Sequence, residues 1–177
     1  MQNQQLLLIY EAFLLVLNND YKSASEKVLR IWNRLEKHDN WYLYDIRLIN
    51  SILYLFPVNI AESIVNLALN RLNDYKNFQN LNQLAANLQI NFLLLLIDNK
   101  KYNKALSEIE KLISFCIEKK FFRHLGVCYV RKGILFDNLK KKDSSYWYTE
   151  GFHLLEKTYN QDLIPELKNE IKYYTTL

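Results

Sequence analysis

Glycine and proline are scarce in this chain, which has 3 and 2 of them among its 177 residues. The turns of hairpins and barrels draw heavily on both residues, so their scarcity excludes a sandwich or barrel of many strands. It also excludes collagen-like chains and Pro/Gly-rich disordered chains. Helical folds are the class that these absences leave.

Cysteine is almost as rare, with Cys116 and Cys128 as the two copies. Two cysteines do not form a disulfide framework, and the sequence has no CxxC pair that would suggest a redox or zinc motif. Both lie in apolar segments with helical spacing. We therefore expect two buried free thiols in a reducing cytosol.

Long hydrophobic runs are also missing. The segment Leu6–Leu17 has only 12 residues, contains Glu11 and follows no Lys or Arg, and no small-residue cleavage site comes after it. The run Leu88–Ile97 contains Asn91 and is far shorter than the ~20 residues that cross a bilayer. These features predict a soluble cytoplasmic protein with no signal peptide and no membrane segment.

The charge of the chain is mild, because 23 Lys and Arg stand against 19 Asp and Glu, for a net charge of +4. A nucleic-acid-binding domain usually carries a stronger and more clustered basic charge. The densest basic run, Lys140–Lys142, is interpreted as a solvated loop, with a contact to phosphate or to an acidic partner as the alternative. No direct contact of this chain with nucleic acid is expected.

Hydrophobic residues make up 50% of the chain and recur at steps of three and four residues, which predicts helices almost throughout. Ser23, with Glu26 three residues later, has the spacing of a capping box and is expected to open the second helix. Pro57 is expected to end the third helix, and Pro165 to lie in the first turn of the last. The predicted helices span about Gln4–Leu17, Ser23–Lys37, Trp41–Phe56, Ile60–Leu72, Phe78–Asp98, Tyr102–Lys119, Phe121–Leu139, Ser145–Tyr159 and Ile164–Tyr174.

These helices are predicted to pair with a period of roughly 37 to 43 residues, which suits an α-solenoid. The segments Tyr21–Ala24 and Tyr102–Ala105 each place a tyrosine three residues before an alanine, as tetratricopeptide repeats do at the start of a second helix. The predicted fold is therefore all-α, a tetratricopeptide-like α-solenoid with a C-terminal capping helix, and the alternative is a generic helical bundle. The four pairs span about 4–38, 41–73, 78–119 and 121–160, with a cap over 164–175, in a single domain over 1–177.

Motifs for chemistry are absent from the sequence. The histidines His38, His124 and His153 have no second His or Cys three or four residues away, and no glycine-rich phosphate loop occurs. Asp45 and Glu110 have no partner that spacing can supply, so each is interpreted as an exposed or paired charge. We expect no enzyme, no catalytic residue, no metal site and no cofactor, and no convincing helix-turn-helix is found.

The polar residues that stand out are amides and an arginine inside apolar helices. Arg47 and Asn50 share one helix face, as do Asn87 and Asn91. An amide can pair with both the N–H and the C=O of an extended peptide, and an arginine can bind a peptide carboxylate. We predict that these residues contact a ligand in a concave groove. The alternative is that the asparagines bond to neighbouring helices, because the chain is rich in asparagine throughout.

Three segments resemble the Rgg/GadR/MutR family of transcriptional regulators. The stretch Trp41–Asn50 is similar to the family segment W-x-x-Y-E-x-x-L-x-N, and Asn91, fourteen residues before Ala105, resembles the asparagine of its central helix. Phe122 through Gly133 to Phe136 resembles its later F-x-x-G helix. The resemblance covers about residues 20 to 175.

The resemblance implies a cytoplasmic, homodimeric regulator that senses a short hydrophobic peptide pheromone in a C-terminal tetratricopeptide-like domain. Arg47, Asn50 and Asn91 would face the peptide groove by this match, and Asn87 joins them by face geometry. The family begins with a helix-turn-helix domain that this chain does not contain. The chain is therefore expected to be the sensor part of a longer regulator. The alternative is a stand-alone helical-repeat adaptor that binds a protein partner without direct control of DNA.

Overall fold

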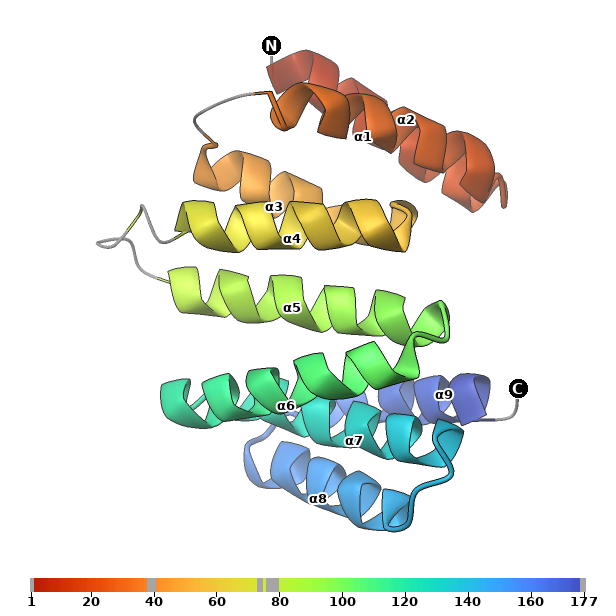
Figure 1. Ribbon diagram of the computed structural model, residues 1–177, viewed down its shortest axis with the longest axis vertical. Coiled ribbons are helices and arrows are strands. Elements are labelled where there is room, and N and C mark those ends of the chain that lie inside the picture. Colours follow the sequence, from red (N-terminus) through yellow and green to blue (C-terminus); the bar gives the residue numbers. More distant parts are fainter. Residues whose placement is uncertain (1, 38–40, 73–74, 76–79, 176–177) are drawn as a thin grey trace. The chain divides into compact units, whose positions relative to one another are not determined.

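The computed structural model describes residues 2–37, 41–72, 75 and 80–175. Every regular element in these ranges is a helix, so the all-α prediction is confirmed for them (Figure 1). The helices are α1 (Gln2–Leu17), α2 (Tyr21–Leu35), α3 (Leu43–Ser51), α4 (Val58–Leu72), α5 (Leu81–Asp98), α6 (Tyr102–Lys119), α7 (Phe122–Asn138), α8 (Ser144–Lys157) and α9 (Ile164–Thr175), with short 3₁₀ turns η1 (Leu53–Leu55) and η3 (Gln161–Leu163).

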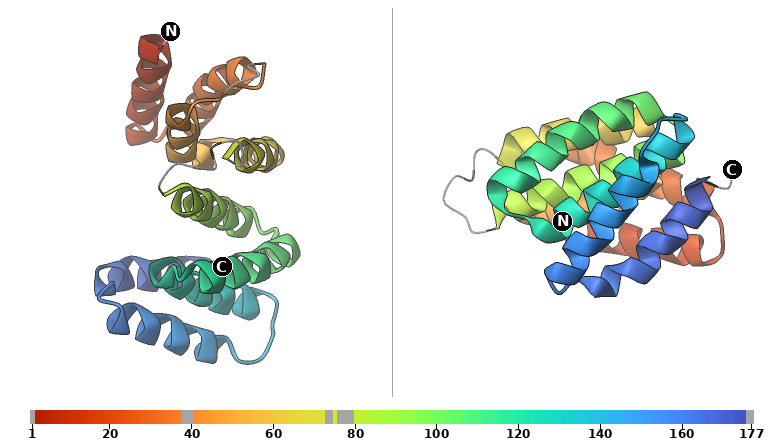
Figure 2. Two further views of the ribbon diagram at one scale, coloured as in Figure 1. Left: turned by 90° about the vertical axis from the view of Figure 1, so that its left-hand side faces the viewer. Right: turned by 90° about the horizontal axis from the view of Figure 1, so that it is seen from below.

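The chain divides into two compact units, 1–81 and 82–177. The first unit holds α1 to α4, and the second holds α5, which begins at the boundary, together with α6 to α9. In the second unit α7 is the central helix, because α6, α8 and α9 all pack against it (Figure 2). A single domain over 1–177 and its solenoid arrangement stay predictions.

Helix ends are built without glycine. Five connections carry a residue in the left-handed region, and the residue after each donates its N–H to a carbonyl five residues earlier, at 2.8–2.9 Å. This is the hydrogen bond of a Schellman motif, in which glycine is the usual left-handed residue. The left-handed residues are Asn19, Lys100, Lys120, Lys140 and Tyr159.

The three glycines lie instead within α7 and α8, where the two helices meet. A Cβ on Gly151 would lie 2.9 Å from the carbonyl oxygen of Gly126 and 2.6 Å from Cγ2 of Val130. A Cβ on Gly126 would lie 2.6 Å from Cγ of Leu155. Glycine is therefore required here for the close approach of two helices, and not for a turn.

The start of α2 corrects one prediction. The N-cap is Asp20, whose carboxylate accepts a hydrogen bond from the N–H of Ser23 at 3.0 Å, so Ser23 lies inside the helix. Hydrogen bonds from the Ser23 side chain and backbone lower the pKa of Asp20. The capping box predicted for Ser23 and Glu26 is therefore wrong, because Asp20 already satisfies the free backbone N–H. Ala24 and Ala105, the alanines of the two junctions that resemble tetratricopeptide repeats, are both fully buried.

The predicted helix over Trp41–Phe56 is shorter in the structure. It ends as α3 at Ser51, and η1 follows before Phe56 takes an extended backbone with φ −88° and ψ 147°. Pro57 explains this ending, because the proline ring disfavours helical geometry in the residue before it. The following helix, α4, then begins at Val58, two residues earlier than predicted.

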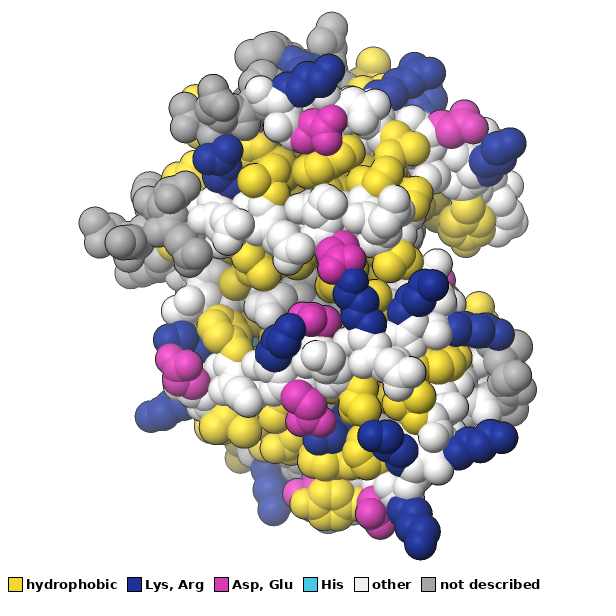
Figure 3. Space-filling view, in the orientation of Figure 1, with side chains coloured by type: hydrophobic (Ala, Val, Ile, Leu, Met, Phe, Trp, Pro, Cys, Tyr) yellow, Lys and Arg dark blue, Asp and Glu magenta, His cyan; other side chains and the backbone are white. Residues whose placement is uncertain are grey.

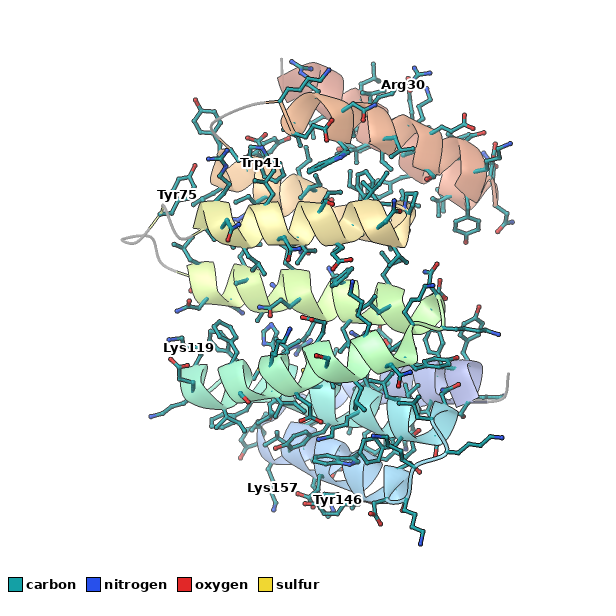
Figure 4. All side chains as sticks on the ribbon, in the orientation of Figure 1. Arg30, Trp41, Tyr75, Lys119, Tyr146 and Lys157 are labelled. Carbon is teal, nitrogen blue, oxygen red and sulfur yellow. The ribbon has the colours of Figure 1, made fainter. Side chains whose placement is uncertain are left out.

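Trp41 anchors the core of the first unit. Its side chain is 1% exposed, and its indole Nε1 donates to the carbonyl oxygen of Leu35 at 2.8 Å. The ring meets that of Trp32 edge to face, with centroids 5.9 Å apart. The hydroxyl of Tyr75 donates to the carbonyl oxygen of Trp41, and Figure 4 labels both residues. These contacts hold Trp41 against the end of α2.

Candidate functional site

Helix α7 carries three of the four buried polar or charged side chains in the described part of the chain, His124, Arg131 and Lys132. Burial of a charge is costly unless the charge is paired. Each of these side chains therefore needs a partner from another helix. The partners of His124 and Arg131 lie on α5 and α9, at one face of α7. Those of Lys132 lie on α6 and α8, at another face.

His124 meets Asn87 of α5 at the first of these faces. The His124 Nε2 and the Asn87 Oδ1 lie 2.8 Å apart. An amide oxygen only accepts, so Nε2 of the imidazole is the donor. Burial lowers the pKa of His124, and the charge of neighbouring Arg123 lowers it further, which keeps the ring neutral at neutral pH. Asn87 itself is exposed, so its Nδ2 hydrogens can be donated to a ligand.

Arg131 lies two turns further along the same face of α7. Its Nε and Nη2 donate to the two carboxylate oxygens of Glu170 on α9, at 2.9 and 2.8 Å. Its Nη1 donates to the carbonyl oxygen of Ile90 on α5, at 2.9 Å. The two side chains are only 7% and 12% exposed, so the ion pair is buried. One arginine thus joins three helices of the second unit.

Helix α9 is held by further contacts on both sides of Glu170. Leu167 is buried in a cluster with Val127, Val130 and Leu155. Toward the C-terminus, Asn138 of α7 donates to the carbonyl oxygen of Tyr174 at 3.0 Å. Burial raises the pKa of the Tyr174 hydroxyl, with the charge of Asp98 as the next cause. Leu167 is the one fully buried residue of α9.

Lys132 belongs to the opposite face of α7. Its Nζ lies 2.7 Å from a carboxylate oxygen of Glu110 on α6 and 3.8 Å from the ring centre of Trp147 on α8. The carboxylate and the π face together compensate the buried ammonium. Glu110 is therefore a paired charge, as expected from the sequence.

The two cysteines lie between α6 and α7. Both are free and fully buried, as predicted. The interaction between the two thiols lowers the pKa of Cys116 and raises that of Cys128, and burial raises the pKa of Cys128 further. Buried free cysteines of this kind pack as small apolar side chains.

The four residues predicted as a ligand site fall in different units. Arg47 is exposed and Asn50 half-buried on α3, whereas Asn87 is exposed and Asn91 half-buried on α5. Their common groove stays a prediction. Sequence reasoning missed His124 and Arg131, which the structure brings to the face of α5 that carries Asn87 and Ile90. Their spacing of seven residues inside an apolar helix was the available signal, since seven residues make about two helical turns.

In the described part of the chain, no three His, Cys, Asp or Glu side chains are grouped so as to hold a metal ion. None of the described helices has the length and apolar character needed to cross a membrane. Figure 3 shows Lys and Arg side chains scattered over the visible face of each unit, with Asp and Glu between them. That face carries no concentrated basic patch of the kind that follows a nucleic-acid backbone.

Comparison with known proteins gives one family. The family model described as the C-terminal domain of the HTH-type transcriptional regulator Rgg matches residues 2–166. No match was found among the curated proteins or the solved structures. The matched range includes Asn87, His124 and Arg131 and ends before Glu170.

Proposed function

The chain belongs to the family of the C-terminal domain of Rgg transcriptional regulators, and we propose that it is the ligand-sensing and dimerisation domain of such a regulator. The proposed ligand is a short hydrophobic peptide, a quorum-sensing pheromone. The family is one of regulators and not of enzymes, so the domain is proposed to act by binding alone. It is further proposed to work in the cytoplasm as a homodimer, with DNA contacted by a helix-turn-helix domain.

The observation that carries this proposal is the Asn87–His124 pair on the face that α5 and α7 form. His124 holds the amide oxygen of Asn87, which fixes the orientation of an exposed side chain. The Nδ2 group then presents two donors in a defined direction. Asn91 is one turn further along α5, so an extended peptide laid along this helix could meet both amides.

Arg47 and Asn50 of α3 are also proposed to contact the peptide, as the family resemblance implies. Their amide and guanidinium groups suit the backbone and the carboxylate of a peptide. Apolar side chains would supply selectivity among peptides. A ligand that binds one arrangement of the regulator more tightly than another shifts the balance between the two, which is how binding would reach DNA.

Titration calorimetry tests the proposal directly. The full chain is titrated with synthetic hydrophobic peptides encoded by short reading frames beside its gene, and one of them is expected to bind. Asn87→Asp keeps the size of the side chain and its acceptor toward His124 but removes the Nδ2 donors. We expect about tenfold weaker binding, the effect of losing one hydrogen bond of roughly 1.4 kcal/mol.

The matched control is Asn82→Asp, which makes the same change at another exposed asparagine of α5. It should leave the affinity unchanged. Equal affinity of the Asn87→Asp variant would contradict the site. No binding of any such peptide, together with a stable complex formed with another protein, would favour the adaptor alternative.

A further inference from the structure

We propose that Arg131 forms a carboxylate-binding site that Glu170 of α9 fills as an internal ligand, and that an acidic, apolar peptide can take the place of α9. This deepens the proposed function, and it rests on that function in taking a peptide as the ligand. The family match ends at residue 166, so Glu170 lies beyond the matched range. Arg131 therefore lies inside the matched range, and Glu170, which binds it, lies outside that range.

The groups that would bind a carboxylate all come from α5 and α7, and none comes from α9. Helix α7 supplies the guanidinium, and the carbonyl oxygen of Ile90 on α5 orients it through Nη1. The remaining edge, Nε and Nη2, is the planar fork that binds a carboxylate with two parallel hydrogen bonds. Glu170 occupies that edge and is the contribution of α9 to the pair.

Forming this ion pair yields little net free energy, although removal of one partner alone is costly because it leaves the other charge buried without a partner. Both side chains are almost fully buried, and removing two charges from water offsets most of their attraction. Such a pair specifies which group occupies the site more than it stabilises the fold. A second carboxylate with equal geometry could therefore replace Glu170 at little net cost.

The apolar contacts of α9 are also limited. Leu167 is its one fully buried residue, and Ile164 and Ile171 are partly buried against the same cluster. Its exposed positions include Glu166, Lys168 and Lys172. The connection before α9 contains Tyr159, which is 89% exposed and has a positive φ of 58°. The apolar attachment of α9 is thus a narrow stripe, and the connection before it is tied to α7 through exposed contacts of Arg123 with Asn160 and Asp162.

The contacts that α9 would leave open define the chemistry of a ligand that replaces it. It would uncover Val127, Val130 and Leu155 beside the free edge of Arg131. A replacement needs a carboxylate for the arginine and an apolar side chain about one turn away, as Leu167 stands to Glu170. The replacing ligand is therefore a peptide with an acidic group next to a large aliphatic residue.

This site adjoins the proposed peptide face. Ile90, which orients Arg131, is three residues from Asn87 on α5, a spacing that places both on one side of the helix. A peptide laid along α5 would therefore reach Arg131 and compete with Glu170. Its binding and the release of α9 would then be coupled, and each would favour the other.

The test uses a fluorescein-labelled synthetic peptide of residues 164–175, with blocked ends, as the probe. Fluorescence anisotropy measures its affinity for the full-length wild-type chain, for Glu170→Gln and for Glu166→Gln. The last removes an exposed carboxylate from the same helix and is the matched control. Glu170→Gln weakens the internal contact, so we expect its affinity for the probe to be about tenfold higher than that of the other two.

Two further arms identify the arginine as the binding group. The double variant Arg131→Gln with Glu170→Gln should lose the gained affinity. A probe that carries Gln in place of Glu170 should bind the Glu170→Gln chain about tenfold more weakly than the acidic probe. Equal binding of the two probes, or equal binding to wild type and Glu170→Gln, would overturn the proposal.

Hydrogen exchange of the wild-type chain keeps the proposal testable if a variant fails to fold. Amides of α9 should exchange about tenfold faster than those of α7, because α9 opens separately. Equal protection of the two helices would also overturn it. Neither measurement uses a pheromone, so a failed pheromone titration with successful probe binding rejects the proposed function and keeps this site.

Discussion

The two units bury charge in different ways. In the first, the buried charged residue is Asp45, whose carboxylate accepts the N–H of Tyr42 three residues earlier, at 2.9 Å. In the second, Arg131 reaches Glu170 and Ile90, 39 and 41 residues away in the sequence. The first arrangement closes a helix end locally, whereas the second ties three helices together. The partner of the buried charge therefore comes from a neighbouring residue in the first unit and from distant helices in the second.

The close packing of helices differs in the same way. The α1–α2 pair buries Ala12 and Ala24, whereas the α7–α8 pair uses Gly126 and Gly151. Alanine permits a moderate approach and favours the helix, and glycine permits a closer one at a cost of about 1 kcal/mol each. In the second unit, glycine thus lowers the helix propensity of α7 and α8 but permits a tight contact between them. The following variants test these differences.

Gly151→Ala should have the largest effect. Its new methyl group would lie 2.9 Å from the Gly126 carbonyl oxygen and 3.0 Å from the backbone nitrogen of Val130, atoms that cannot rotate away. Overpacking costs typically 1–3 kcal/mol and can exceed the gain of about 1 kcal/mol in helix propensity. We expect a net loss of about 2 kcal/mol in urea unfolding, with faster hydrogen exchange confined to 82–177.

Gly133→Ala is the control for this variant. The three atoms nearest to a methyl group there all belong to the side chain of Tyr148 and none to the backbone, so the neighbour can shift more easily. Its loss of stability should be clearly smaller. Equal losses for the two glycines, or faster exchange spread equally over both units, would contradict the contrast drawn between them.

Asp45→Ala is the counterpart in the first unit. It removes the carboxylate that accepts the N–H of Tyr42 at the start of α3. Loss of such a cap costs about 1 kcal/mol, so urea unfolding should show a loss of that size, with exchange rising in 41–51. Asp45→Asn keeps an acceptor oxygen and should retain most of the stability. A loss as large for Asn as for Ala would show that the charge matters more than the hydrogen bond.

Lys120→Gly should raise stability by about 1 kcal/mol, because this residue has φ 58° and glycine adopts that conformation without steric cost. Lys119→Gly, one residue earlier and inside α6, should lower stability by about the same amount. Thermal unfolding of the two variants measures the difference. Shifts of the same sign would contradict the assignment of Lys120 as the left-handed residue.

The smallest expected effect is a pH dependence centred on His124. Burial lowers its pKa in the folded chain, so the unfolded chain takes up the proton first as the pH falls through about 6.5. Stability should therefore fall as the pH drops below about 6.5, and His124→Gln should reduce this slope. An unchanged slope in this variant would remove His124 as its cause.

The sequence predicted local features well. The bounds of α6 agree with the prediction, and most of the others differ by one or two residues, because helical periodicity and Pro57 act within a few residues of the chain. The predicted start of the fifth helix, Phe78, lies outside the described residues. The errors arose where nearby residues compete for one role. Asp20, for example, caps α2 in place of Ser23. The resemblance seen around Trp41, Asn91 and Gly133 agrees with the family match.

The candidate site was only partly predictable. Asn87 and Asn91 were singled out because amides inside an apolar helix are conspicuous, and their contact with a ligand stays a prediction. Arg131 was missed because its partners are far away in the sequence. No spacing rule connects residues 131 and 170. The groove formed with Arg47 and Asn50 stays a prediction.

The sequence by itself determined that this protein is helical, where most helices begin and end, and to which family it belongs. These properties follow from residue propensities and patterns that act over one or two helical turns. Only the tertiary structure decided that His124 fixes Asn87, that glycines serve the α7–α8 contact, and that Glu170 fills the fork of Arg131. The reason is physical, because a buried polar group takes its partner from whichever element packing brings within hydrogen-bond distance.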